Sequence, residues 1–314
     1  MAGFAPEVLA LLDSMGLQAP MGMGEKFFVN GGADGVTTGV NAVGRGSKDR
    51  PFLSIAYALP HCVRGRNDYI FCTNTNHQDE AASIEIPSLL DNVHIIGLAM
   101  PGCSPLELNV TGDYPAFMLN PGVLLGPVRC LEIAGFTISG GPTHGGIEVD
   151  GACDMIWIHH CSFGHNWGAG SQDGIRFNGI SVTMSPLIED NWFYGTSGPR
   201  GRLTQFGITG LMMAQGAIRR NHFVRVPTGA ISLLGGFVEE NAIEDNIIGC
   251  GADALGNAIT LGAPSRANVV AHNEAQFGQA VMTNNPYNDL AGATDNDWIS
   301  NQLGIAIHWP TVAV

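Results

Sequence analysis

The sequence predicts an all-β solenoid, in which short strands stack turn upon turn along one axis. The first observation is a recurring phrase, consisting of an apolar residue, two polar residues, an asparagine, any residue and another apolar residue. Its asparagine slot is filled in turn by Cys161, Asn191, Asn221, Asn246, Asn273 and Asn301, which lie 25 to 30 residues apart. A repeat of this length is typical of stacked solenoids.

The second observation is the period of the apolar residues within each repeat. Residues 147–149, 175–177, 231–233, 259–261 and 281–283 alternate in polarity, mostly behind a glycine, as short half-buried strands do. Helical spacing is absent from these stretches, which argues against a helical repeat array. The 43 glycines are expected at the corners of the coil, where a positive φ is needed.

The first element along the chain differs in kind from the rest. Residues 6–16 predict a short amphipathic helix, with Val8, Leu12 and Met15 on one face and Gly16 as its stop. We divide the chain into this segment, residues 1–26, and a coil over residues 27–314. The segment either caps the first turn or docks into a larger assembly, since so short a helix must pack on something.

The next stretch opens the coil. A strand at Phe27 and a loop rich in glycine precede Gly46-Ser47, Pro51-Phe52, Ser54-Ile55 and Ala58-Leu59. This passage resembles the opening of β-helix proteins of tailed bacteriophages and related surface proteins, in which it caps the coil. Gly46-Ser47-Lys48 lacks the residue order of a phosphate-binding loop.

The repeats over roughly residues 27–310 resemble the right-handed parallel β-helix of pectate-lyase-like proteins. In such a coil each rung lies about 4.8 Å from the next, and at about 28 residues per rung residues 27–314 would make about ten rungs. The recurring asparagines would then stack and hydrogen-bond along the axis. Leu98 and Phe136 occupy the same slot in earlier repeats and are expected to be apolar substitutes, as Cys161 is.

The stretch from Trp157 to Phe163, followed by Asp173, is similar to a calcium-binding phrase of pectate lyases. His159 replaces the aspartate of the first phrase, and Phe177 replaces the second carboxylate of the next, so the calcium ligands are broken. Calcium is therefore expected only if a lyase site is retained. An enzyme would draw its catalytic residues from Asp173, Arg176, His160 and Glu189. The alternative, which we favour, is rung packing, with Trp157 and His159 facing outward.

Acidic pairs recur just before the asparagines, at 189–190, 239–240 and 244–245. Two carboxylates on neighbouring rungs would suit a glycosidase. The alternative is a charge ladder, because Arg219 and Arg220 fill the same slot in the intervening repeat. A zinc site among His144, His159, His160 and His165 lacks partners at ligand spacing.

Charge and composition limit the partners. The net charge of −14, with 14 scattered Lys and Arg, disfavours nucleic-acid binding. No apolar run reaches membrane-spanning length, and residues 8–12 are too short for a signal peptide. The seven cysteines form no CxxC pair and are expected to be structural thiols. Only 13% of residues are charged, which hints at a buried flank and an oligomer.

Three functions remain open. The sequence favours a non-catalytic structural protein of a tailed-phage virion, a capsid decoration protein or a small spike, made in the host cytoplasm and forming a homotrimer. Residues 1–26 would contact other virion proteins such as the major capsid protein. The second function is a tailspike-type polysaccharide lyase or hydrolase. The third is binding of a host surface glycan by stacking aromatic residues, for which the candidates are Trp157, Trp167, Trp192 and Tyr194.

Overall fold

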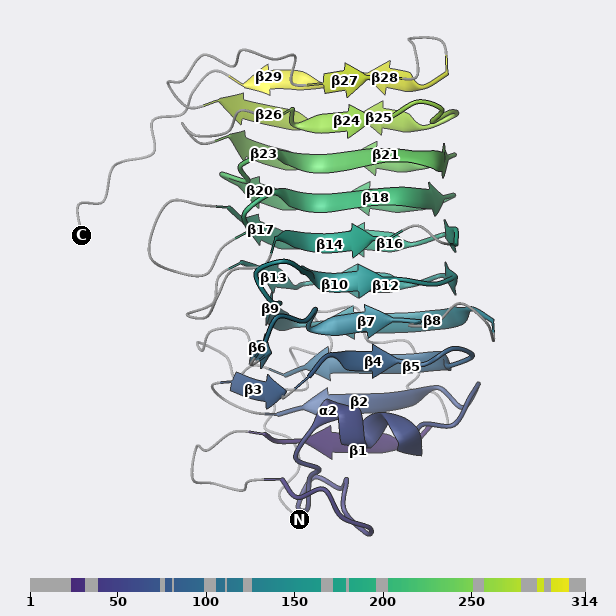
Figure 1. The fold of residues 1–314 in the computed structure, drawn as a ribbon, viewed down its shortest axis with the longest axis vertical. Coiled ribbons are helices and arrows are strands. Elements are labelled where there is room, and N and C mark those ends of the chain that lie inside the picture. Colours follow the sequence, from purple (N-terminus) through teal and green to yellow (C-terminus); the bar gives the residue numbers. More distant parts are fainter. Residues whose placement is uncertain are drawn as a thin grey trace, which may run out of the picture.

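The computed structural model is a parallel β-solenoid whose turns stack along its longest axis (Figure 1). It describes residues 24–31, 39–73, 77–80, 82–98, 106–110, 112–120, 126–164, 172–178, 181–195, 203–250, 257–277, 287–290 and 295–304. Strands of successive turns pair in parallel along the coil, in two sheets of 20 and nine strands. The predicted fold class is confirmed.

The coil has three walls, and each is named after one of its strands. The β10 wall contains β4 (Ile84–Ile86), β7 (Phe117–Leu119), β10 (Gly145–Val149), β14 (Asp173–Phe177), the first part of β18 (Phe206–Ala214) and of β21 (Gly229–Glu239), β24 (Ile259–Leu261) and β27 (Tyr287–Asp289). The short strands β11 (Cys153–Asp154) and β15 (Thr183–Met184) lead from this wall to the next.

The β12 wall contains β1 (Lys26–Val29), β2 (Asp68–Cys72), β5 (Asp91–Gly97), β8 (Val128–Ala134), β12 (Trp157–His159), β16 (Leu187–Glu189), β19 (Ala217–Arg219), β22 (Ala242–Glu244), β25 (Val269–Ala271) and β28 (Asp297–Ile299). The β13 wall contains β3 (His77–Glu80), β6 (Leu106–Val110), β9 (Phe136–Ser139), β13 (Ser162–Phe163), β17 (Trp192–Tyr194), β20 (His222–Val224), β23 (Ile247–Cys250), β26 (Glu274–Phe277) and β29 (Gln302–Gly304).

The predicted count of about ten rungs is too high for complete turns. Among the described residues, β1 has no strand of the other two walls in its turn, and the turn of β2 and β3 has no β10-wall strand. All three walls are present only from β4 onward. Residues 55–61 form a short helical cap in place of wall strands, so dividing the chain length by the repeat overestimates the number of complete turns.

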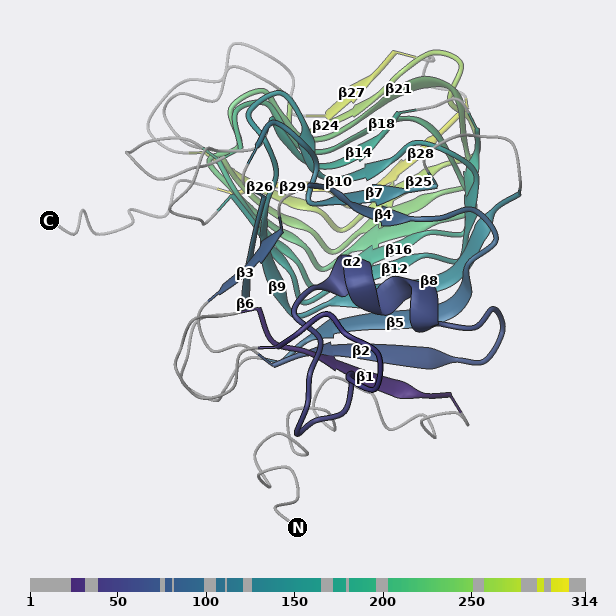
Figure 2. The same cartoon turned by 60° about the horizontal axis from the view of Figure 1, so that its bottom comes forward.

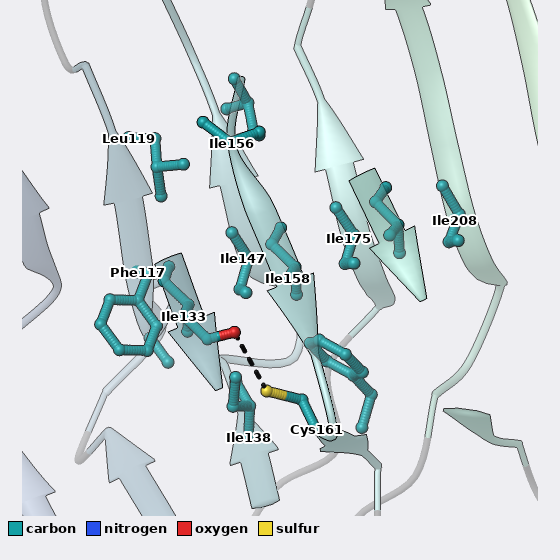
Figure 3. Close-up of a cluster of buried hydrophobic side chains, with 14 of the residues drawn as sticks. Phe117, Leu119, Ile133, Ile138, Ile147, Ile156, Ile158, Cys161, Ile175 and Ile208 are labelled. Carbon is teal, nitrogen blue, oxygen red and sulfur yellow. Dashed lines mark hydrogen bonds between the residues drawn. The ribbon is translucent and has the colours of Figure 1, made fainter. Parts of the chain in front are cut away.

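Alternation along each strand sends one row of side chains into the coil. Ile147, Ile158 and Ile175 are buried in one continuous core with Phe117 and Cys161 (Figure 3). Phenylalanine rings stack from turn to turn at the β13 wall, where Phe163, Phe193 and Phe223 lie with centroids 4.8 and 4.6 Å apart. These distances match the spacing of parallel strands, so each ring packs on the ring of the next turn.

The first turn is capped by the passage that resembles the phage proteins. A short helix, α2 (Ile55–Ala58), continues into a 3₁₀ turn at Leu59–His61. The Ser54 hydroxyl caps α2 by accepting a hydrogen bond from the Tyr57 amide at 3.2 Å. Phe52, Ile55 and Leu59 join the main core, and α2 lies against the end of the coil beside β1 and β2 (Figure 2). The helix predicted over residues 6–16 lies outside the described residues.

The corner between the β12 and β13 walls carries the predicted asparagine ladder. The Asn221 Nδ2 donates to Asn246 Oδ1 at 3.1 Å, and the Asn221 backbone N–H donates to the same oxygen at 3.0 Å. In the same way, Asn191 donates to Asn221, Asn246 to Asn273, and Asn273 to Asn301. A second ladder of Asn241, Asn268 and Asn296 runs along the corner before the β12 wall. Stacked amides therefore connect the turns at two corners.

The prediction that glycine supplies the positive φ at the corners is wrong for most turns. The residue before each ladder position is His160, Asp190, Arg220, Asp245, His272 or Ser300, with φ between 49° and 56°. The residues predicted to replace asparagine in the earlier turns lie in two different hydrophobic clusters. Phe136 is buried in the main core, whereas Leu98 packs in a second cluster with Phe28, Tyr69, Phe71, Ile96 and Ala134.

Five cysteines of the described part, Cys62, Cys72, Cys130, Cys153 and Cys161, are free thiols, and burial raises the pKa of Cys153 and Cys161 to about 12. Within the described residues, no helix has the length and apolar character needed to cross a membrane.

Candidate functional site on the outer faces of the coil

The four candidate catalytic residues lie on two different walls. Asp173 and Arg176 are on β14 of the β10 wall, where the intervening Ile175 points into the core. Glu189 ends β16 of the β12 wall, and His160 forms the corner after β12. Because the packed core separates the outer faces of these walls, the four side chains form two groups.

The first group centres on Glu148, a residue that the sequence analysis missed. Its side chain is 4% exposed, and its Oε1 accepts hydrogen bonds from Arg176 Nη1 at 3.0 Å and from the Gly145 amide at 2.9 Å. Asn178 donates to its Oε2 at 3.1 Å, and His144 lies 3.3 Å from its Oε1. Pairing of β10 with β14 places Glu148 directly beside Arg176.

Asp173 shares the same arginine. Its Oδ2 lies 2.6 Å from Arg176 Nη2, and its Oδ1 accepts from the Phe206 amide at 3.0 Å. Burial raises the pKa of Asp173, and the Arg176 charge opposes that rise. Both carboxylates are thus occupied by one guanidinium and by backbone amides, which is the pattern of a buried structural ion pair.

The second group is a histidine cluster of His94, Glu132, His159 and His160 on the outer face of the β12 wall. Glu132 Oε1 lies 2.8 Å from His159 Nε2, and Glu132 Oε2 is hydrogen-bonded to His94 Nδ1. His159 Nδ1 lies 2.7 Å from His160 Nδ1. His159 faces outward as predicted, yet it is 0% exposed because the neighbouring polar side chains and Trp157 cover it.

The cluster fixes the charge of its carboxylate. Burial alone would raise the pKa of Glu132, but the hydrogen bonds from His159 and His94 outweigh burial and lower that pKa to about 2. The pKa of His160 is lowered by burial and by the neighbouring His159. Glu132 is therefore anionic at any ordinary pH, and it is a poor general acid.

Trp157 belongs to the packing of this wall. Its indole stacks on the His159 ring with centroids 3.9 Å apart, and its Nε1 donates to Glu189 Oε1 at 3.0 Å. Glu189 in turn accepts from Arg219 Nε at 2.8 Å, and Asp190 pairs with Arg220 at 2.9 Å. The acidic pair at 189–190 is thus neutralised by the arginines of the next turn, as the charge-ladder interpretation expects.

The remaining aromatic candidates lie on the β13 wall. Trp192 is 43% exposed and stacks on His222 of the next turn, with centroids 4.3 Å apart and planes 9° apart. Tyr194 lies beside Trp192 at 5.9 Å and 15°. Parallel pairing of β13 with β17 places Ser162 of the preceding turn beside Trp192, and Phe163 beside Phe193. Gly164 follows Phe163 in the chain. Trp167 lies outside the described residues.

In the part of the chain that the structure describes, no group of three or more His, Cys, Asp or Glu side chains is arranged to hold a metal ion.

The comparisons with known proteins concern the fold. No protein-family model and no curated protein matches the sequence. Among solved structures, the chain is similar to DFA-IIIase from Arthrobacter chlorophenolicus A6 in complex with GF2, with a TM-score of 0.42 and 13% identity over 74% of this chain and 69% of that one. It is also similar to an alginate lyase from Paenibacillus sp. (TM-score 0.37, 10% identity, 80% and 96% covered). A third similar structure is the Dettilon tailspike protein, with a TM-score of 0.34 and 14% identity over 94% of this chain and 66% of that one.

Proposed function

We propose that this chain is a non-catalytic structural rod of a tailed-phage virion, acting as a capsid decoration protein or a small spike. The observation that carries the proposal is the state of the buried outer carboxylates. Glu132, Glu148, Asp173 and Glu189 are each paired with histidine or arginine side chains. A glycosidase or lyase needs at least one carboxyl group that is free to exchange a proton with its substrate. Here the histidine and arginine partners bind these carboxylates.

The two asparagine ladders support a mechanical role. Each internal ladder asparagine is buried and donates both to the next amide and to a carbonyl of an earlier turn, as Asn221 does to Asn246 and Ile188. Polar networks whose members are all hydrogen-bonded stiffen the structure that contains them. A coil connected in this way transmits force along its axis with little bending.

The cap of the first turn supports the phage assignment. Gly46, Phe52 and Ile55 belong to the passage that resembles phage β-helix openings, and Phe52 and Ile55 seal the core there. In this proposal residues 1–26 dock onto other virion proteins such as the major capsid protein. Removing them should abolish attachment to the particle and leave the coil folded.

A flat row on the outer face of the β12 wall suits contact with further copies. Leu187, Ala217, Ala242 and Val269 follow one another in register on four successive strands, and all are partly or well exposed. Small apolar side chains let two such faces approach closely, and they carry no charge that would be desolvated. In this proposal three copies bury these rows around a three-fold axis.

The molar mass in solution tests this arrangement. We expect a trimer for the natural sequence and a monomer for Ala217→Glu, because the new charge falls within the buried row. Thr260→Glu is the matched control, since Thr260 is partly exposed on the outer face of the β10 wall. A natural protein that stays monomeric at all concentrations would contradict the proposed trimer. Dissociation caused by Thr260→Glu and not by Ala217→Glu would show that the copies contact each other through the β10 wall.

A second candidate function, glycan binding, is favoured by the exposed indole of Trp192. Trp192 and Tyr194 form a shelf of two nearly parallel rings, and the facing residue of the preceding turn, Ser162, is small. A sugar ring that lies on an indole needs this kind of open face. Parallel rings do not form an aromatic cage for a cation, and the net charge of −14 disfavours acidic sugars.

Binding of neutral oligosaccharides, followed by calorimetry, tests this candidate. We expect Trp192→Ala to abolish binding and Trp192→Phe to retain part of it. Trp298→Ala on the β12 wall is the control for general loss of tryptophan. No heat with any neutral oligosaccharide, or equal binding by Trp192→Ala, would eliminate the shelf as a glycan site.

A further inference from the structure

The histidine cluster connects four successive turns on the outside of the β12 wall. Asn67, just before β2, lies 2.8 Å from His94 Nε2, and His94 on β5 contacts Glu132 on β8. Glu132 contacts His159 on β12, and His159 contacts His160 at the corner. The next residue, Cys161, donates its backbone N–H to Asn191 at 2.9 Å, which begins the asparagine ladder.

The hydrogen-bond partners determine where the protons lie on His94. Asn67 Nδ2 donates to the Tyr69 hydroxyl, so its oxygen faces His94 Nε2, which must carry a proton. His94 Nδ1 faces the Glu132 carboxylate and carries a proton as well. His94 is therefore an imidazolium that balances the charge of Glu132.

The same reasoning gives His159 a proton on Nε2, opposite Glu132 Oε1. Between His159 Nδ1 and His160 Nδ1, at 2.7 Å, there is room for one proton only, because one nitrogen must accept what the other donates. The pair can take a first extra proton on the exposed side of His160 and keep this contact. With a second extra proton, two N–H groups point at each other.

We propose that the histidine cluster is an acid-sensitive clasp, in which full protonation of the His159 and His160 pair breaks their contact and loosens residues 157–161. The charges facing the pair do not prevent this. Glu132 is already balanced by His94, and Glu189 and Asp190 of the next turn are balanced by Arg219 and Arg220. His159 has no exposed surface, so water cannot stabilise a positive charge on it.

The direction of the pH effect follows from the burial of the pair. Burial holds the pKa of His160 below its ordinary value of about 6.5, so the unfolded chain binds more protons than the folded one as the pH falls below that value. The stability contributed by the clasp is therefore complete above about pH 6.5 and decreases toward the lowered pKa.

Amide hydrogen exchange of residues 157–161 at pH 7 and pH 5, corrected for intrinsic rates, tests the clasp. We expect exchange at pH 5 to be faster by about tenfold or more in the natural protein, because the opened segment binds the protons that the closed pair resists. His160→Gln should remove the effect, because its amide can either donate to His159 or accept from it. The matched control is His272→Gln, since His272 occupies the same corner before Asn273 with the same backbone conformation.

Ring titration by NMR provides a test that needs no variant. We expect His160 to titrate below its ordinary pKa of about 6.5, because burial lowers that pKa. Titration of the His160 ring at or above pH 6.5 would overturn the proposal. So would acid-induced exchange that persists in His160→Gln or disappears in His272→Gln.

Discussion

The corner between the β12 and β13 walls is built in two ways along the coil. In the turn that precedes Cys161 it is apolar and uses glycine. Gly135 has a φ of +77°, a Cβ there would lie 2.3 Å from the Gly97 carbonyl oxygen, and the buried Phe136 follows. In the later turns residues such as Asp190 and Arg220 adopt the left-handed conformation, and a ladder asparagine follows. The left-handed residue is common to both kinds of corner.

The asparagine ladder compensates for the cost of the left-handed conformation. A left-handed conformation costs a residue with a Cβ about 1 to 2 kcal/mol, which glycine avoids. In the later turns the stacked amides offset that cost with several buried hydrogen bonds per turn. At this corner glycine occupies the left-handed position of Gly135, where no ladder asparagine follows, whereas Met155 and Ser185 adopt the same conformation at the preceding corner without one.

Cys161 stands between the two kinds of corner. Its thiol lies 3.3 Å from the His159 carbonyl oxygen and 3.8 Å from the Ile133 carbonyl oxygen, and the Asn191 amide donates to the corresponding Ile158 oxygen at 2.9 Å (Figure 3). Its backbone N–H donates to Asn191, so it closes the first step of the ladder.

Breaking the ladder in its middle should have the largest effect. Asn221→Ala removes the acceptor of the Asn191 backbone N–H and the Asn221 Nδ2 donor to Ile188 and Asn246, and leaves Asn246 Oδ1 with only the backbone N–H of residue 221. We expect the free energy of unfolding to fall by about 3 to 5 kcal/mol, measured by urea denaturation. The control is Asn301→Ala, at the end of the ladder and only half buried, which should cost about half as much. Equal losses would mean that the ladder is not cooperative.

Adding a side chain to the glycine corner tests the other half of the comparison. Gly135→Ala combines left-handed strain with a clash against the Gly97 carbonyl, and should cost about 2 to 4 kcal/mol. Gly65→Ala is the matched control, because Gly65 has a similar φ of +72° and open space around it. It should cost about 1 kcal/mol. If both variants have the same unfolding midpoint, close packing is not what requires glycine at this corner.

The charge ladder beside the asparagine corner should matter less. Arg220→Ala removes the partner of Asp190 and one partner of Glu189, and should cost about 1 to 2 kcal/mol at pH 7. Burial tends to raise the pKa of Asp190, but Arg220 lowers it overall, so this contribution is present above about pH 4 and is lost as the pH falls through the lowered value.

The difference between Arg220→Ala and the natural protein should therefore shrink on acidification, as thermal unfolding from pH 7 to pH 3 would show. Arg129→Ala, which removes an exposed pair with Asp154, is the control and should cost under about 1 kcal/mol. A gap that widens in acid would contradict the role given to Arg220.

The smallest expected effect is a gain in stability. Cys161→Asn extends the ladder by one step, with donors toward Ile133 and Asn191, and should raise the free energy of unfolding by up to about 1 kcal/mol. Cys161→Ala is the comparison, and should lower it because the Ile133 carbonyl loses its partner. A loss of stability in Cys161→Asn would show that the earlier turns exclude the amide.

The sequence was sufficient for the features that repeat. The period predicted the strands and the Asn191 ladder, and the spacing of Arg219 from Glu189 predicted their ion pair. The ladder of Asn241, Asn268 and Asn296 was missed, although its steps of 27 and 28 residues carry the same signal.

Glu132 and Glu148 were missed for a physical reason. Whether an acid on an outer face is buried depends on the residues 27 or more positions away in the neighbouring turns, here His94, His159 and Arg176. Strand register decides those neighbours, and unequal loops between the walls hide it from a linear pattern. Aligning the turns on the ladder position would have placed Glu148 beside Asn178, two residues from its strand partner Arg176, because the connection between the β10 and β12 walls is two residues longer in the turn of Arg176.

The most direct test of the central claim is depolymerisation of acidic and neutral polysaccharides, with and without calcium, by protein of known mass in solution. The paired state of Asp173, Glu148 and Glu132 predicts no cleavage of any polymer under either condition. Cleavage by the natural protein that is lost in Asp173→Ala, while the variant remains folded, would contradict the structural role and establish an enzyme.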